Sequence, residues 1–296
     1  MKSLFSYLII IASTAAVGVA GGLTVKKLTT PKEVVYGDVN LETYKNDALA
    51  DYEAVNKYSG ANKANAFASY QIINYSLEKY RRCEYSYSFG IGMGVTVIDQ
   101  EIRSAQIKYG NTYWEESLSQ SPIVGIANRM VQTGVGSDVE FYSAPKEGVS
   151  MTGCSSYGSK PKIFTSEKYE STYGRTLDMM FIYIIHKSTV LDGNTKRLDS
   201  GEYEVTLSLD PIWSTYRYKL QMKNISSLDS LPVFKSVKLT FTLTSDLELK
   251  GMLAKEYYSA KMGFPADITN TINYSYFPNQ KYEIPSIKEA FQYKKI

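Results

Sequence analysis

Alternation of apolar and polar residues is the feature that most restricts how this chain can fold. From position 83 to position 97 every second residue is apolar, and the residues between them are polar or glycine. A period of two places all the apolar side chains on one face of an extended strand. The same alternation recurs in residues 202–209, 235–244 and 268–276. Strands with one apolar and one polar face are typical of antiparallel sheets, so we expect a large antiparallel sheet.

The segment 83–97 is too long for an ordinary strand, which has about 5–6 residues. It carries Gly90, Gly92 and Gly94 on one face. We expect the strand to bend at these glycines, with residues 100–109 and 111–118 as its next neighbours. The glycine spacing does not match the G-x-G-x-x-G fingerprint of dinucleotide sites, and no cofactor is expected.

Helical spacing of apolar residues occurs in only a few segments. Residues 41–58 and 62–82 repeat apolar side chains at steps of three and four, and residues 211–223 do so again. A short helix is expected at 122–133, because Ser121 suits an N-cap, Pro122 suits the first helical position and Gly134 suits the end.

These elements predict an α+β fold in which a large curved antiparallel sheet, a half-barrel, packs on a few helices. A helix is only about 10 Å wide, so the expected helices cannot cover such a sheet completely. The uncovered apolar face has to close on itself, pack on another molecule or enclose a ligand, because large exposed apolar patches are rare on soluble monomers.

The N-terminus predicts export. Residues 3–25 form a run without charged side chains. This run is long enough for a transmembrane helix, which needs about 20 apolar residues. We favour an uncleaved membrane anchor over a cleaved signal peptide, for which Gly18-Val19-Ala20 would supply the cleavage site. The expected organisation is an anchor or signal peptide at 1–27, a tether at 28–40 and an extracytoplasmic domain at 41–296.

The charge balance argues against nucleic acid as a partner. The formal net charge is +3. Lys2, Lys26 and Lys27 account for all of it, because residues 1–27 contain no acidic residue, and the rest of the chain is neutral. A neutral domain lacks the basic footprint that binds phosphates, so no nucleic-acid partner is expected.

The residues of common catalytic and metal sites are scarce. His186 is the one histidine, which excludes HExxH and other two-histidine metal sites, and we expect a structural role for it. No catalytic motif is present, and we expect neither an enzyme nor a metal protein. Cys83 and Cys154 are the two cysteines; in an exported chain they either form one disulfide or remain two buried thiols.

The order of elements over residues 62–283, which ends in SVKLTFTLTSDLELKGMLAKEYYSAKMG, resembles a family of half-barrel lipoprotein- and lipid-binding proteins that includes the LolA, LppX and MucB/RseB types. The resemblance is one of layout. The chain departs from it in its additional helix at 41–58 and in lacking the lipobox cysteine of the lipoprotein members. The resemblance implies a bent sheet that wraps helices around an apolar cavity.

Two functions follow from this layout. The first is a membrane-anchored binding protein that holds a lipid, a lipoprotein or another apolar ligand in the concave face of the sheet. The second is a non-enzymatic cell-surface interaction or structural protein whose core is solid and whose 26 tyrosines contact other molecules. The cavity residues expected for the first function are Tyr85, Tyr87, Phe89, Ile91, Phe241 and Tyr274; in the second they are plain core.

Overall fold

The computed structural model of the 296-residue chain describes most of the region between residues 41 and 277. The described residues are 41–77, 79–109, 112–123, 126–135, 138–143, 149–150, 153–154, 162–165, 167–168, 171, 183–226 and 228–277. The expected anchor and tether lie outside them. No helix in the described part of the chain is long and apolar enough to cross a membrane.

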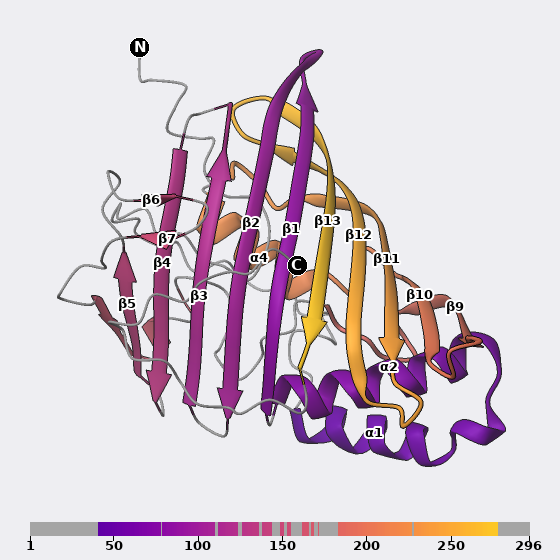
Figure 1. The fold of residues 1–296 in the computed structure, drawn as a ribbon. Coiled ribbons are helices and arrows are strands. Elements are labelled where there is room, and N and C mark those ends of the chain that lie inside the picture. The colour runs from indigo at the N-terminus through magenta and orange to yellow at the C-terminus, as the bar shows by residue number, and fades with distance from the viewer. Residues whose placement is uncertain are drawn as a thin grey trace, which may run out of the picture.

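An open antiparallel sheet of 11 strands makes up most of the structure (Figure 1). The strand order is β8-β5-β4-β3-β2-β1-β13-β12-β11-β10-β9. The strands are β1 (Lys79–Gly92), β2 (Val95–Tyr109), β3 (Thr112–Ser121), β4 (Ile126–Val135), β5 (Asp138–Ser143), β8 (Lys162–Phe164), β9 (Val190–Arg197), β10 (Tyr203–Leu209), β11 (Val233–Leu243), β12 (Leu249–Lys261) and β13 (Pro265–Tyr276). A separate pair is formed by β6 (Val149–Ser150) and β7 (Gly153–Cys154).

Strand β1 connects the two halves of the sheet. It pairs with β2, its successor in the chain, and with β13, the last described strand. The pairing of Tyr85 with Asn273 illustrates this register. Segments far apart in the sequence therefore meet at the middle of the sheet, while β8 and β9 form its two edges.

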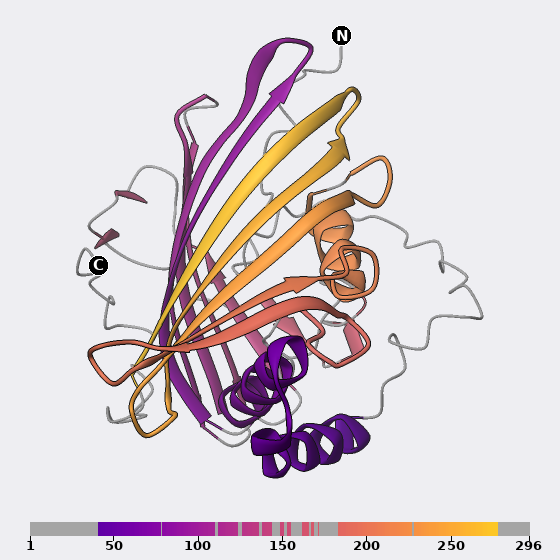
Figure 2. The ribbon, with the colours of Figure 1, turned by 90° about the vertical axis from the view of Figure 1, so that its right-hand side faces the viewer.

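The helices lie on one side of a strongly twisted sheet. Figure 2 shows the strands rotating steadily from β1 to β9, in keeping with the twist that L-amino acids impose on strands. Helix α2 (Gly60–Leu77) packs on β9 and β10, and α1 (Leu41–Glu53) and the short η2 (Val55–Lys57) pack on α2. Helix α4 (Tyr216–Ser226) contacts the same side, with the Tyr218 ring 5.5 Å from that of Phe234. We call the side that α2 and α4 cover the inner face.

The main apolar core lies between this inner face and the helices. It joins Phe67 and Ile72 of α2 to Leu207 of β10, Leu239 of β11 and Ile268 of β13, all of which are buried. Gly193 lets α2 approach β9 closely, because a Cβ at this position would lie 2.9 Å from the Cβ of Ala64. The coarse prediction of an α+β protein with a large antiparallel sheet is confirmed.

Most of the individual strands expected from alternation are also confirmed. The segments 202–209, 235–244 and 268–276 correspond to β10, β11 and β13. Helix 211–223 appears as α4, with residues 211–215 forming turns before it. Helices 41–58 and 62–82 appear as α1 and α2, although α2 ends at Leu77 because β1 begins at Lys79.

The prediction of a helix at 122–133 is wrong. Pro122 and Ile123 lie in a turn after β3, and the chain continues as β4 from Ile126 to Val135, paired with β3 and β5. Residues that cap a helix also favour turns, so the same signal fitted both structures. The pairing with two neighbouring strands determined the outcome.

The single bent strand expected at 83–97 is instead a hairpin. Met93 and Gly94 both have positive φ, 52° and 78°, and join β1 to β2. Two adjacent positive φ angles are the mark of a type I′ turn, whose twist matches that of the flanking strands. Gly90 serves packing, since a Cβ there would lie 3.0 Å from Ile268.

Candidate binding site

The structure separates the six residues that were expected to line one cavity. Phe241 and Tyr274 lie on the inner face and are buried. Glu84 is the cross-strand partner of Tyr274, so the even-numbered residues of β1 face inward and the odd-numbered ones outward. The outward-facing residues are Tyr85, Tyr87, Phe89 and Ile91. The prediction that all six share one face is therefore wrong.

The outer position of these residues is visible in their exposure. Tyr87 is 39% exposed and Ile91 is 49% exposed. Alternation shows which side chains share a face, but it does not show which face is buried. On β1 the buried face is the polar one, because its side chains find polar partners on the neighbouring strands.

Arg82 is at the centre of this polar inner face. Its guanidinium is fully buried and donates from Nε to Gln106 Oε1 and from Nη1 to the Tyr276 hydroxyl at 3.2 Å. The guanidinium carbon also lies 4.7 Å and 4.6 Å from the ring centroids of Tyr80 and Tyr274. Burial alone would lower the pKa of Arg82, but the tyrosines and the nearby Glu84 raise it, so the charge is retained.

Glu84 lies next to Arg82 on the inner face and shares its network. Gln106 donates from Nε2 to Glu84 Oε2 at 3.3 Å and to Ser104 Oγ at 3.1 Å. Ser104 itself donates to Glu84 at 3.5 Å. An arginine, a glutamate and the amide between them therefore form one buried network across β1 and β2.

A second buried carboxylate, Glu256, lies on β12. It accepts hydrogen bonds from the Tyr183 hydroxyl and from Asn270 Nδ2, the latter at 2.8 Å. Asn270 in turn accepts from Ser88 of β1 at 3.0 Å. Burial raises the pKa of Glu256 to about 7, while the hydrogen bonds from Tyr183 and Asn270 lower it and so limit the rise.

Three hydroxyl groups on the inner face lack a hydrogen-bond partner among the described residues. They belong to Ser86 of β1, Ser117 of β3 and Tyr258 of β12, and all three residues are buried. Leaving a buried polar group without a partner costs about 1–3 kcal/mol. Such groups on the inner face are therefore candidates for contacts with a bound molecule or with water.

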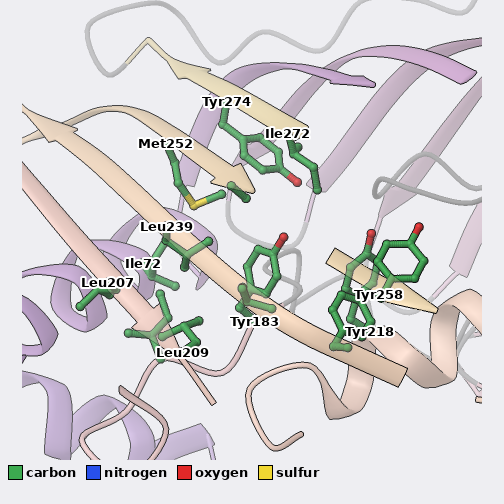
Figure 3. Close-up of a cluster of buried hydrophobic side chains, with 14 of the residues drawn as sticks. Ile72, Tyr183, Leu207, Leu209, Tyr218, Leu239, Met252, Tyr258, Ile272 and Tyr274 are labelled. Atoms are coloured by element: carbon green, nitrogen blue, oxygen red, sulfur yellow. The ribbon is translucent and has the colours of Figure 1, made fainter. Parts of the chain in front are cut away.

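The other half of the inner face is apolar. Figure 3 shows Ile72, Leu207, Leu239 and Met252 pointing into the same interior as Tyr274. These side chains come from α2, β10, β11, β12 and β13. The inner face therefore changes from mainly apolar on β10 and β11 to mainly polar on β1–β3, with Glu256 of β12 and Asn270 of β13 at the boundary.

The polar residues of the site were missed from the sequence, although a signal existed. On β13, Asn270 stands between Ile268 and Ile272 in a stripe that is otherwise apolar, and Glu256 stands between Ala254 and Tyr258 on β12. A polar residue within an apolar stripe indicates a buried partner. Both interruptions lie at the same level of the sheet, because Glu256 and Asn270 are cross-strand partners.

An open cleft of about 600 Å³ lies at the edge of the sheet, near α1 and α2. Its lining residues are Tyr52, Glu53, Val55, Asn56, Lys63, Phe67, Thr195, Arg197, Tyr203 and Leu247. No sequence pattern predicted this cleft, because its walls come from residues 52–67 and residues 195–247, which are far apart in the chain.

The remaining candidates have structural positions. Cys83 is a half-buried free thiol, so it forms no disulfide in this structure, and burial raises its pKa; the side chain of Cys154 lies outside the described residues. His186 lies in a turn rather than in a strand, and its Nε2 is 3.5 Å from Asp47 of α1. In the described part of the chain, no three His, Cys, Asp or Glu side chains gather as metal ligands would.

Comparison with known proteins gives no family. No protein-family model matches the sequence, and no curated protein matches it. The ywiB protein from Bacillus subtilis is similar in structure at a TM-score of 0.20 and 9% identity, over 67% of this chain and 92% of that one. The 12:0-ACP thioesterase from Umbellularia californica has a TM-score of 0.16 at 8% identity, over 77% and 88% of the two chains. These scores are too low to support a shared fold or function.

Proposed function

We propose that this protein is a membrane-anchored extracytoplasmic binding protein that holds an amphipathic ligand against the inner face of its sheet. The apolar part of the ligand would lie along β10–β12 and its polar part along β1–β3. The buried, unpartnered hydroxyls of Ser86 on β1 and Ser117 on β3 carry this proposal, because a polar group of the ligand would supply their missing hydrogen-bond partners.

The division of the inner face supports an amphipathic ligand rather than a purely apolar one. Phe241 and Leu239 offer an apolar surface, whereas Arg82 and Glu84 are charged and buried. A hydrocarbon laid across Arg82 and Glu84 would gain nothing from their polarity. A fatty acid, a lipid headgroup or an acylated peptide would match both halves.

The experiment measures binding of a fluorescent fatty acid, 11-dansylaminoundecanoic acid, to the full-length protein. Ser86→Ala removes one unpartnered inner hydroxyl, and we expect roughly five- to tenfold weaker binding together with equal or higher stability of the unliganded protein. Ser275→Ala is the matched control, since Ser275 lies on the outer face of the adjacent strand. Phe241→Glu should abolish binding, and Tyr87→Glu should leave it intact.

Two outcomes would reject the proposal. One is a wild-type protein that binds no probe and yields no lipid on mass spectrometry of its organic extract. The other is equal weakening by Ser86→Ala and Ser275→Ala, which would place the probe elsewhere.

A second candidate function, surface interaction, has its own supporting observation. The outer end of the β1–β2 hairpin exposes Ile91, Met93 and Val95, which are 49%, 73% and 59% accessible. Exposed apolar groups that adjoin one another mark contact surfaces. Chemical cross-linking in cells should lose a specific product in an Ile91→Ser, Val95→Ser double variant if this surface binds another protein.

A further inference from the structure

We propose that the cleft between α1, α2 and β9 binds a small carboxylic acid with an aromatic or aliphatic body. This site lies at the edge of the sheet. Its strand β10 is four positions away from β1 in the strand order. It is separate from the polar inner face and does not depend on the function proposed above.

The cleft has one apolar wall built mainly from aromatic rings. Tyr52 of α1 stacks on Tyr70 with ring centroids 3.9 Å apart and meets Phe67 edge-on at 6.0 Å. Phe67 stacks on Tyr203 of β10 at 6.2 Å. These contacts hold the rings in place before any ligand arrives, so little conformational entropy is lost on binding.

The cleft lining also carries two cations without acidic partners, next to the aromatic rings. Neither Lys63 of α2 nor Arg197 of β9 forms an ion pair with any other residue that the structure describes. The guanidinium carbon of Arg197 lies 5.7 Å from the ring centroid of Tyr203, which orients it along the aromatic wall. Glu53 also lines the cleft, so the lining has one net positive charge, which suits a monoanion better than a phosphate.

A buried hydroxyl group in the cleft lining supplies a directional contact. Thr195 lines the cleft, and its Oγ1 is buried without a hydrogen-bond partner among the residues described. A carboxylate between Arg197 and Lys63 can accept a hydrogen bond from Thr195, which would satisfy this group.

Leu247, which lines the cleft, has a backbone conformation that is energetically unfavourable for leucine. Leu247 has φ of 65°, a left-handed conformation that usually belongs to glycine or asparagine. Its carbonyl accepts a hydrogen bond from Gln71 of α2, which fixes the turn, and its side chain lines the cleft. A leucine held in a glycine conformation is explained if its side chain is needed there.

The test compares 3-phenylpropionate with its neutral analogue 3-phenylpropanol, using calorimetry on the full-length protein. The acid should bind saturably, and the alcohol at least fivefold more weakly. Arg197→Gln and Lys63→Gln should each weaken the acid by fivefold or more without affecting the alcohol. Thr195→Val should weaken the acid and keep the fold, because valine has the same shape.

Lys196→Gln is the control for charge. Lys196 is exposed and follows Thr195 on the same strand, so it faces away from the cleft. Equal binding of acid and alcohol, equal loss in Lys196→Gln and Arg197→Gln, or no binding of either probe would overturn the proposal. None of these variants touches Ser86 or Phe241, so failure here is separable from failure of the inner-face ligand.

Discussion

Asn270 Nδ2 donates a hydrogen bond of 2.8 Å to Glu256 Oε2, and the two residues are direct cross-strand partners on β13 and β12. The bond spans the centre of the inner face, where Ser88 continues it to β1. Strands β12, β13 and β1 are thus connected by side chains as well as by their backbones. Each buried polar group on this line depends on its neighbour for satisfaction.

The buried position of Glu256 predicts that stability falls as the pH rises. Its pKa is about 7 in the folded protein and 4.5 as the ordinary value, so the folded state holds the proton more tightly. The contribution of the protonated Glu256 to the free energy of unfolding is fully present below about pH 4.5. It is lost as the pH rises to about 7, and the total loss is about 3 kcal/mol.

Glu256→Gln tests this, because glutamine keeps the shape and does not titrate. Urea unfolding between pH 4.5 and 8 should show the wild-type protein losing stability relative to the variant across that range. A constant difference between the two proteins would show that Glu256 does not change its protonation on unfolding.

Arg82 should contribute more to stability than any exposed arginine. Arg82→Met removes the charge that faces Glu84 and the donors to Gln106 and Tyr276, and we expect a loss of about 3–5 kcal/mol. Arg82→Lys keeps the charge but not the planar fork, and should recover only part of this loss.

Arg103→Met is the comparison, since Arg103 pairs with Glu101 on the outer face and remains partly exposed. Pairs of this kind contribute about 0–1 kcal/mol. Equal losses in Arg82→Met and Arg103→Met, measured by chemical denaturation, would mean that the buried network adds nothing.

The sequence predicted the second half of the sheet well and the first half less well. In β10, β11 and β13 the apolar stripe is also the buried one, so alternation identified both the strands and their inner faces. In β1 the apolar stripe lies outside, and its inner face is set by pairing with Tyr274, far away in the chain. A period of two is symmetric between faces, so no local pattern distinguishes them.

Neither candidate site was accessible to local patterns. The polar inner face brings together Arg82, Gln106 and Tyr276 from three strands, and the cleft joins Lys63 of α2 to Arg197 of β9. Only the polar interruptions at Glu256 and Asn270 signalled a buried network. Their partners depend on strand order, which the sequence alone does not fix.

The hairpin turn predicts a stabilising substitution. Met93 has φ of 52° and is 73% exposed, so its side chain gains little packing in return for a disfavoured backbone. Asparagine tolerates this conformation and is preferred in type I′ turns. Met93→Asn should raise the free energy of unfolding by about 0.5–1 kcal/mol.

Val95→Asn serves as its control. Val95 is exposed in the same hairpin but belongs to β2, where asparagine is disfavoured, so no gain is expected. A gain of equal size in both variants would trace the effect to surface polarity rather than to the turn.

The N-terminal segment leads to the last prediction, which concerns the location of the domain. Residues 3–25 are uncharged, and Lys26 and Lys27 follow them directly. An apolar segment of this length inserts into a membrane and carries the following chain across, so the domain from residue 41 onward should be accessible from outside. Protease added to intact cells or protoplasts should digest it, whereas a cytoplasmic marker should survive. Deletion of residues 1–27 should leave the same domain protected until the cells are lysed. A full-length protein that resists protease in intact cells but is cut after lysis would place the domain in the cytoplasm and remove the basis for an extracytoplasmic binding role.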